Sequence, residues 1–372
     1  MRILVVNAGS SSLKLRLLDD TDEVIRTADL AADADGFDAT ALAATLGDWP
    51  KPDVVGHRVV HGGTEFSSAA RIDASVTDRL QYLTDLAPLH QPKSLAALAA
   101  VTAAMPDVPA VACFDTAFHQ TLAPAAYTYA VPAAWRERYG VRRYGFHGLS
   151  HAYASRRAIE LTGRPADGTR IVVCHLGAGA SLCAVRDGRS VDTTMGFTPL
   201  DGLVMATRSG SVDPGLVLWL EEHEHLGPRE VATALEQRSG LLGLSGTADF
   251  REVERRAALG QAAARLALDV HLRSLVAGIA AMAAALDGLD VLVLTGGAGE
   301  HSPTLRQRTA ERLAWLGVGV DGWRNSQVTG DTDISADDAT VACVVVAARE
   351  DLQIAREVRA LCHTSPAGAD PR

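Results

Sequence analysis

The stretch that decides the fold is Met1–Asp20, MRILVVNAGSSSLKLRLLDD. Apolar residues rich in β-branched side chains run up to Asn7, then one glycine and three serines interrupt them, and an apolar alternation resumes at Leu13. This pattern predicts two strands joined by a tight loop. The loop would offer backbone N–H groups and the hydroxyls of Ser10 and Ser12 to an anion such as a terminal phosphate.

The same plan recurs in the stretch from Ile171, IVVCHLGAGASLCAVRDG. Superposing the two stretches places Asn7 on His175 and Gly9 on Gly177. A repeat across half the chain predicts duplication of a domain that begins with a hairpin, with the two copies facing each other.

A third strand followed by a glycine loop and a helix is expected at VLVLTGGAGEHSPTLRQRTAERL. There Ser302 and Pro303 have the residue types of a helix cap and a first helical position, and the helix is expected from Thr304 to Leu316. Apolar periodicity predicts further helices after Pro92 and over the stretch 260–286. The polar stretch 28–52 is expected to be a connector or a small surface elaboration.

The composition sets limits on the class of protein. A chain of 372 residues predicts two domains, and 47% hydrophobic with 22% charged residues is typical of a soluble α/β protein. A formal charge of -10 argues against binding to nucleic acid or to an anionic membrane. The N-terminal apolar run is too short for a signal peptide, and the run from Leu275 is about half a membrane span, so a cytoplasmic location is expected.

The five cysteines show no CxxC pair and are odd in number, which predicts neither a disulfide framework nor a thiolate metal site. Three of them lie inside apolar runs that resemble strands, so buried, inert thiols are expected.

The three glycine turns, NAGSSS, HLGAGAS and TGGAGEHS, are candidate phosphate-binding loops. A Walker A loop is excluded because the chain has no Gly-Lys dipeptide. The one GxGxxG match, Gly317–Gly322, follows a predicted helix instead of a strand and is treated as chance. What remains is a nucleotide held between two related halves by paired hairpin loops. Lys14 would either add charge there or reach solvent.

Motifs along nearly the whole chain resemble, in order, those of the acetate kinase family. They are NAGSSSLK, GHRVVHGG, LAPLHQP, FDTAFHQT, YGFHGLSH, CHLGAGAS, MGFTPLDGL, TRSGSVDP, SGTADFR, TGGAGEHS and AREDLQIARE. The resemblance implies the superfamily of sugar kinases, actin and heat-shock chaperone ATPases, with two domains of duplicated ribonuclease-H-like topology around a nucleotide cleft. Domain I would comprise 1–119 with 352–372, and domain II 120–351.

The resemblance also implies an activity. Members of the family are typically homodimers that transfer the γ-phosphoryl group of ATP to acetate with Mg²⁺, reversibly and by direct in-line transfer, giving acetyl phosphate and ADP. Acetate is already ionised near neutral pH, so no base is needed and the work is alignment and charge neutralisation. Arginine suits this because its planar fork pairs bidentately with carboxylate or phosphate.

By resemblance, Arg58 binds the substrate carboxylate, Arg208 stabilises the phosphoryl group in transfer, and Asp115 contacts substrate or positions Arg58. His147 would donate a hydrogen bond to the phosphoryl group in transfer, and His90 would be a second histidine of the active site. The spacing from His147 to His151 lacks the glutamate of HExxH, so a zinc site is not expected.

Three further sets of residues follow from the resemblance. The walls of a small apolar acid pocket are assigned to Val60, Leu89, Phe146 and Pro199. The nucleotide site is assigned to Ser10, Ser12, Lys14, His175, Leu176, Gly177, Ala178, Gly179, Asp249, Phe250, Arg251, Gly297, Ala298, Gly299, Glu300 and His301. The Mg²⁺ (or Mn²⁺) site is assigned to Glu350, with Asn7 as a possible helper.

The chain departs from the family pattern at two positions, where Ala178 and His301 replace the usual asparagines. The loss of both amides removes polar contacts near the nucleotide, so weaker ATP binding or another phosphoryl donor is a possible outcome. Two alternatives therefore stay open. One is a propionate or butyrate kinase, or an acyl kinase that uses pyrophosphate; the other is an actin-like nucleotide switch without an acyl substrate.

Overall fold

The protein is described here by a computed structural model that defines residues 1–9, 12–33, 36–86 and 91–364. Contacts divide the chain into two compact units. Unit 1 comprises Met1–Gln120, Phe146–Tyr153 and Arg349–Arg372, and unit 2 comprises Thr121–Gly145 and Ala154–Ala348. The functional domain boundaries expected after residues 119 and 351 stay a prediction.

Unit 1 is built on a seven-stranded sheet with the order β4-β3-β2-β1-β5-β7-β6. Its strands are β1 Ile3–Ala8, β2 Ser12–Leu18, β3 Val24–Asp33, β4 Gly36–Phe37, β5 Val54–Val59, β6 Ala70–Arg71 and β7 Ala110–Phe114. β1 and β2 pair antiparallel as the predicted hairpin, while β1, β5 and β7 run parallel to one another. Because they are parallel, the carboxyl ends of β1, β5 and β7 meet at one edge.

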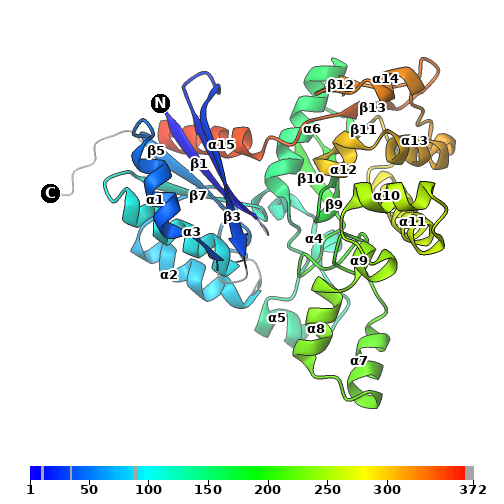
Figure 1. Ribbon diagram of the computed structural model, residues 1–372, viewed down its shortest axis with the longest axis horizontal. Coiled ribbons are helices and arrows are strands. Elements are labelled where there is room, and N and C mark those ends of the chain that lie inside the picture. Colours follow the sequence, from blue (N-terminus) through cyan, green and yellow to red (C-terminus); the bar gives the residue numbers. More distant parts are fainter. Residues whose placement is uncertain (10–11, 34–35, 87–90, 365–372) are drawn as a thin grey trace. The chain divides into compact units, whose positions relative to one another are not determined.

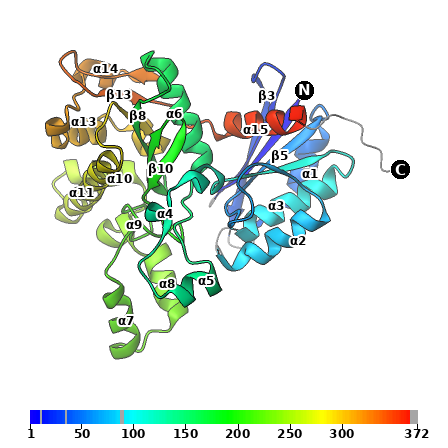
Figure 2. The same ribbon diagram turned by 180° about the vertical axis from the view of Figure 1, so that it is seen from behind.

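Helices cover both faces of this sheet. Successive side chains of a strand point to opposite faces, and the strands present apolar side chains on both. Leu4 and Val6 of β1 pack with Leu42 of α1 (Ala39–Gly47) and with α3 (Gln91–Ala104). Ile3 and Val5 pack instead against α15 (Glu350–Thr364). Figure 1 shows this C-terminal helix beside β1 and β5, and Figure 2 shows α1, α2 and α3 grouped together. The remaining helices of this unit are α2 Ala74–Tyr82 and the 3₁₀ turns Leu83–Leu86 and Ala117–Thr121.

Unit 2 repeats the plan of unit 1 in a six-stranded sheet with the order β10-β9-β8-β11-β13-β12. Its strands are β8 Arg170–Leu176, β9 Ala180–Arg186, β10 Arg189–Thr193, β11 Val291–Thr295, β12 Thr332–Asp333 and β13 Ala342–Val345. Three antiparallel strands followed by two parallel ones occur in both sheets, so β8 corresponds to β1, β11 to β5 and β13 to β7. The predicted duplication and the α/β fold class are confirmed.

The long helix α11, Ala262–Ala285, packs on the sheet of unit 2 against β8, β9 and β10. By length and composition alone it could cross a membrane, with 39% of its most apolar window buried inside the protein. It is longer than the apolar run noted from Leu275. Its contacts with the sheet and with α9, α10 and α13 are those of a core helix.

The remaining helices are α4 Pro124–Tyr127, α5 Ala133–Tyr139, α6 Gly148–Thr162, α7 Pro214–His223, α8 Pro228–Gln237, α9 Gly240–Ser245, α10 Phe250–Ala258, α12 Gly296–His301, α13 Pro303–Arg312, a 3₁₀ turn Ala314–Leu316 and α14 Gly322–Ser326. The cap of α13 is as predicted: Ser302 Oγ accepts from the Leu305 N–H over 3.0 Å, and Pro303 is the first helical residue. The helix ends at Arg312, four residues earlier than expected.

One expectation about organisation was wrong. The stretch 28–52 is part of β3 and α1 instead of a surface connector, because Leu42 and Leu46 of α1 enter the core. An alanine-rich helix with only two large apolar residues shows a weak periodic pattern, although both side chains are buried. The expected burial of cysteines is observed: Cys113, Cys174, Cys183 and Cys343 are buried free thiols, and Cys362 is half-buried.

Candidate active site

Four polar side chains meet at the edge of the unit 1 sheet where β1, β5 and β7 end. Asn7 comes from β1, Arg58 from β5, and Asp115 follows β7. Glu350 is the first residue of α15. The parallel strands fix the first three positions, and the packing of α15 on the sheet adds the fourth.

The Arg58 guanidinium is held from three sides. Its Nη2 donates to Asp115 Oδ2 over 2.6 Å, and its Nε lies 3.1 Å from both Asp115 oxygens. Its Nη1 donates to Asn7 Oδ1 over 3.1 Å and lies 3.9 Å from Glu350 Oε2. Asn7 Nδ2 in turn donates to Glu350 Oε2 over 2.6 Å. The orientation of the arginine is therefore set before any substrate arrives.

Burial and charge act together on this group. Burial alone would lower the pKa of Arg58, but the charges of Asp115 and Glu350 raise it above its usual value. Burial raises the pKa of Asp115, and Arg58 opposes that shift. Two carboxylates around one guanidinium keep the cation charged in a site where an unpaired charge would be costly.

The backbone of His147 is hydrogen-bonded to the Asp115 carboxylate. Its backbone N–H donates to the Asp115 side chain, and the Gly148 N–H donates to the Asp115 carbonyl over 2.9 Å. His147 has a positive φ of 56°, which is strained for a residue with a side chain. A Cβ at Gly148 would lie 2.2 Å from the Asp115 carbonyl oxygen, so only glycine fits this turn. Strain of this kind is typical of functional sites.

The expected apolar walls in this unit are buried. Val60 is 7% exposed and Phe146 1% exposed. The Phe146 ring packs edge-on against His61, with ring centroids 5.5 Å apart. Val60 and Phe146, the two predicted pocket residues described in this unit, are thus buried apolar side chains.

Sequence reasoning missed the residues that hold the loop around His61. Gln91 accepts from the His61 N–H and donates to the His61 carbonyl, both over 3.1 Å. Thr116 Oγ1 accepts from the Gly62 N–H over 3.0 Å. The only signal was position, since Gln91 and Thr116 lie inside two of the motifs quoted above.

In unit 2, the β8–β9 turn carries the predicted phosphate loop. The Gly177 N–H donates to the Gly179 carbonyl over 3.0 Å, which closes the turn after His175 and Leu176. The carbonyl of Ala178 accepts from the Ala206 N–H over 3.2 Å. This bond ties the glycine loop to the segment that contains Arg208.

Arg208 lies half-buried in that segment. Its Nη1 donates to the carbonyl of the buried Pro199 over 2.8 Å, and its charge opposes the rise that burial causes in the pKa of Glu236. The Met205 N–H donates to the Arg208 carbonyl over 3.1 Å. The structure therefore brings together Arg208, Pro199 and the Gly177–Gly179 loop.

The third glycine loop is the short helix α12. The Gly296 N–H donates to Glu300 Oε1 over 2.9 Å, and the same oxygen accepts from the Ala348 N–H over 3.0 Å. A Cβ at Gly296 would lie 2.9 Å from the Leu176 carbonyl carbon, so α12 packs directly on the glycine loop between β8 and β9. Around Gly297 there is open space.

Arg306 supports α12 from inside the protein, and sequence reasoning did not identify it. Its side chain is 1% exposed and donates to the carbonyls of Gly299 (2.9 Å) and Glu300 (2.8 Å). It also donates to the side-chain and backbone oxygens of Asn325, each over 2.7 Å. Burial lowers the pKa of this arginine, and the last carbonyls of α12 offset its charge.

The predicted adenosine residues on α10 have structural roles. Asp249 caps the helix, accepting from the Arg251 N–H over 3.0 Å, and Phe250 packs edge-on against His271 at 5.4 Å. Arg251 is largely exposed, as are Ala178 and His301. Lys14 is exposed and faces Asn7 across β1 and β2, so the two side chains share a face of the sheet. Ser12 begins β2, while Ser10, Leu89 and His90 lie outside the described residues.

The fit of a divalent cation depends on Glu350 and Asn7. Within the described residues no group of three or more His, Cys, Asp or Glu side chains could hold a metal ion. Mg²⁺ takes few protein carboxylates and keeps several waters, so one glutamate with substrate phosphates is a sufficient oxygen set. Asn7 Oδ1 accepts from Arg58 and Nδ2 faces Glu350. In this arrangement the asparagine orients the glutamate.

Comparison with known proteins gives a consistent result. The profile of the acetokinase family matches residues 48–356. A protein named acetate kinase from Methanosarcina acetivorans is 40% identical, with 98% of both chains covered. The structure of Porphyromonas gingivalis acetate kinase is 34% identical with a TM-score of 0.87, covering 97% of this chain and 99% of that one. A propionate kinase from Francisella tularensis subsp. tularensis is 34% identical with a TM-score of 0.88, covering 96% and 98%.

Proposed function

The chain belongs to the acetokinase family, and from that premise we propose that it transfers the γ-phosphoryl group of ATP reversibly to acetate, giving acetyl phosphate and ADP. As a family member it is a phosphotransferase with a carboxyl group as acceptor. The observation that carries the choice of a carboxylate acceptor is the fixed orientation of Arg58 between Asp115, Asn7 and Glu350. A guanidinium held in this way is suited to a planar anion.

The proposed step is a direct in-line displacement. An acetate oxygen forms a bond to the γ-phosphorus while the bond from that phosphorus to the β–γ bridging oxygen breaks, and ADP leaves with the bridging oxygen. Acetate is ionised, so no proton has to be removed. Arg58 neutralises the carboxylate, and Asp115 positions Arg58. Arg208 and His147, with His90, stabilise the charge on the phosphoryl group in transfer.

The substrate walls are proposed to be Val60, Phe146 and Pro199, with Leu89. The apolar character of these four side chains suits a short acyl chain. One extra methylene changes binding by only about 1–3 kcal/mol, so propionate and butyrate are the nearest alternative acceptors. The similarity to a propionate kinase supports testing them.

The nucleotide is proposed to bind the glycine loops. Backbone N–H groups of Ala178 and Gly179, with Ser10, Ser12 and Lys14 from the N-terminal motif, are the proposed phosphate-binding groups. The open space around Gly297 on α12 suits a nucleoside. In this proposal Asp249, Phe250 and Arg251 form the remaining edge of the adenosine site.

A bound Mg²⁺ would supply charge neutralisation and alignment of the phosphates. Glu350 is proposed to hold it through one carboxylate, with Asn7 keeping that carboxylate in place. Residues 1–119 with 352–372 are proposed as domain I and 120–351 as the nucleotide-binding domain II.

A cytoplasmic homodimer is also proposed, and an apolar helix supports the dimer. α7 has no buried residue, and it exposes Leu216 (46%), Leu218 (58%) and Trp219 (47%). An exposed apolar surface of this kind is typical of an interaction site. A second copy of the chain is the proposed partner.

The test is the trapping of acyl phosphate as hydroxamate. Purified protein, Mg²⁺ and ATP are incubated with acetate, propionate or butyrate, and parallel reactions replace ATP by pyrophosphate. The proposal expects hydroxamate with ATP and acetate in the largest yield. A product with pyrophosphate alone would identify a different donor. ATP hydrolysis that does not respond to any of the acids would overturn the proposal in favour of a nucleotide switch.

A further inference from the structure

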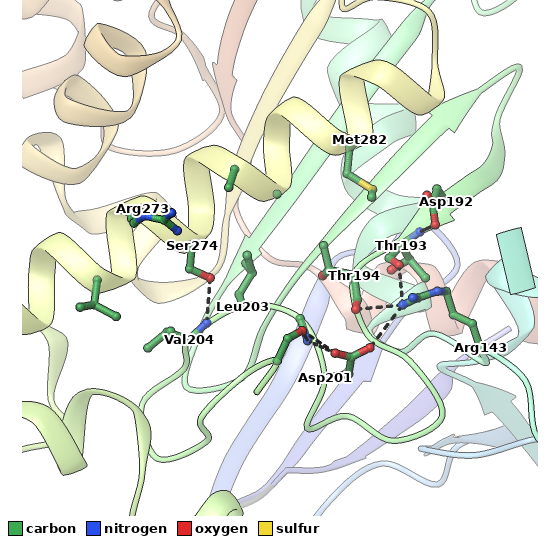
Figure 3. Close-up of a pocket in the computed structure, with 15 residues that line it drawn as sticks. Arg143, Asp192, Thr193, Thr194, Asp201, Leu203, Val204, Arg273, Ser274 and Met282 are labelled. Atoms are coloured by element: carbon green, nitrogen blue, oxygen red, sulfur yellow. Dashed lines mark hydrogen bonds and ion pairs between the residues drawn. The ribbon is translucent and has the colours of Figure 1, made fainter. Parts of the chain in front are cut away.

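Unit 2 contains a cavity of about 470 Å³ that the proposed reaction does not use. It lies between the end of β10, the segment 201–211 and one side of α11 (Figure 3). At about 30 Å³ per water molecule, the volume corresponds to roughly 15 waters, enough for a small metabolite. The lining residues are Arg143, Asp192, Thr193, Thr194, Asp201, Gly202, Leu203, Val204, Ser211, Val270, Arg273, Ser274, Ala277, Gly278 and Met282.

One end of the cavity carries net negative charge. Arg143 Nη1 donates to the carbonyls of Thr193 (3.1 Å) and Thr194 (3.0 Å) and lies 3.7 Å from Asp201 Oδ2. Asp192 lies at the same end, and its only hydrogen bond among the described residues is from the Thr193 N–H over 2.7 Å. Burial raises the pKa of Asp192, while the Thr193 N–H and the charge of Arg143 oppose that shift. Two carboxylates thus face a single guanidinium.

The other end carries the positive charge of Arg273, which is exposed to solvent. Figure 3 shows Arg273 on α11, well apart from Asp192, Arg143 and Asp201. The Arg273 side chain makes no hydrogen bond or ion pair with any residue in the described parts of the chain. The hydroxyl oxygen of the neighbouring Ser274 already accepts a hydrogen bond from the Val204 N–H over 3.1 Å.

Apolar groups separate the two charged ends. Leu203 and Val204 from the loop, with Val270, Ala277 and Met282 from α11, line the cavity. A ligand that matches this wall needs opposite charges at its ends and a short apolar body between them.

We propose that this cavity binds a small zwitterion, such as an ω-amino acid or a dipeptide, with its carboxylate on Arg273 and its ammonium group on Asp192. A polyanion fits less well, because it would bring negative charge against Asp192 and Asp201, which already outnumber Arg143. A plain fatty acid would leave the half-buried Asp192 carboxylate without a cation of its own, because Asp192 and Asp201 share the single guanidinium of Arg143.

The spacing of the ends sets the length of the ligand. Five residues separate Arg273 from Gly278 on α11, a rise of about 7.5 Å. A Cβ at Gly278 would lie 3.2 Å from Leu203 Cδ2 and 3.8 Å from Thr194 Cγ2, so Gly278 lies where the apolar wall adjoins the threonines of the negative end. The charges of the ligand should therefore be separated by one to two helical turns, on the order of 5–10 Å.

Occupancy of the cavity should act on the segment that contains Arg208. Gly202 and Ser211 line the cavity, and the Ser211 N–H donates to the Gly202 carbonyl over 3.0 Å. Arg208 lies between them in sequence. A ligand that rigidifies this segment would change turnover with little effect on the binding of acetate in unit 1. This regulatory part rests on the proposed function, whereas the binding part does not.

The binding test is calorimetric titration of the full chain, without nucleotide and in saturating acetate. The probes are glycine, 4-aminobutyrate, 6-aminohexanoate and 8-aminooctanoate, with hexanoate and hexylamine as ligands that lack one charge. We expect 6-aminohexanoate to bind at least about tenfold more tightly than glycine, hexanoate or hexylamine. Equal affinities for 6-aminohexanoate and hexanoate, or no binding of any zwitterion, would overturn the proposal.

Variants locate the site. Arg273→Gln and Asp192→Asn should each weaken 6-aminohexanoate about tenfold or more. Arg265→Gln is the matched control, because Arg265 is an exposed arginine of the same helix that does not line the cavity. Unchanged affinity in Arg273→Gln would contradict the assignment, and the exposed position of Arg273 keeps its replacement from disturbing the fold. If 6-aminohexanoate binds but leaves hydroxamate formation unchanged, the site stands and the regulatory part fails.

Discussion

Arg58 and Asp115, which are 57 residues apart in the sequence, form a bidentate pair whose shortest contact joins Nη2 and Oδ2 at 2.6 Å. The same guanidinium also reaches Asn7. Arginine is required here because lysine is a point charge on a flexible stem and cannot satisfy both partners in one geometry.

Arg58→Lys should therefore lower kcat/KM for acetate by about 10²–10³, because the carboxylate loses a fixed planar partner. Steady-state kinetics with varied acetate measures the effect. The matched control is Arg79→Lys, which alters an exposed pair with Glu65 in the same unit and should leave kinetics unchanged. Normal kcat/KM in Arg58→Lys would remove this residue from the site.

Arg208→Ala should lower kcat by about 10³ or more, because it removes a cation that acts on the charge developing in transfer. The affinity for ATP, measured by calorimetric titration, should fall only modestly. Arg229→Ala, at an exposed position on α8, is the control and should retain full turnover. Near-normal kcat in Arg208→Ala would contradict the assignment.

Arg306→Met should raise KM for ATP and lower the melting temperature together. The change leaves the Gly299 and Glu300 carbonyls without their buried donor, at a cost of about 1–3 kcal/mol for each group. Arg312→Met, at an exposed position on the same helix, should change neither quantity. A melting temperature that falls while KM for ATP stays constant would reduce Arg306 to a purely structural residue.

Stability should fall as pH decreases from 6.5 towards 4. Burial lowers the pKa of His57, His61 and His271 to about 4, so below pH 6.5 the unfolded chain binds protons that the folded chain does not. At pH 5 each such histidine should cost up to about 2 kcal/mol of unfolding free energy.

Urea unfolding at pH 7.5 and pH 5.0 measures this effect. In His57→Leu the loss of stability between the two pH values should be smaller by about that amount than in the wild type. His363→Leu, at an exposed position, should leave the loss unchanged. An identical loss in the wild type and in His57→Leu would show that His57 is protonated in the folded state.

Leu216→Glu should convert the proposed dimer into a monomer, because it places a charge in the exposed apolar face of α7. Light scattering after gel filtration gives the mass. Leu259→Glu is the control, since Leu259 is an exposed apolar residue (67%) that follows α10 instead of α7. A wild-type chain that is already monomeric would rule out the dimer itself.

Local sequence determined much of this protein. The hairpin after Asn7, its repeat at His175 and the cap at Ser302 were all predictable, because strand periodicity, glycine turns and helix caps depend on residues a few positions apart. The pairing of Arg58 with Asp115 was expected only from the family resemblance, because the two residues are 57 positions apart. Positions read from family motifs added the rest of the candidate site.

Only the tertiary structure decided the contacts between distant segments. Asn7 meets Glu350 because α15 packs on β1, and no local pattern encodes that contact. Arg306 appeared in the sequence as one of many charged helix residues, yet it is buried under α12. The cavity beside Arg273 depends on the packing of α11 against the loop at Leu203. Burial and long-range packing are properties of the folded chain as a whole, so single-sequence patterns do not reveal them.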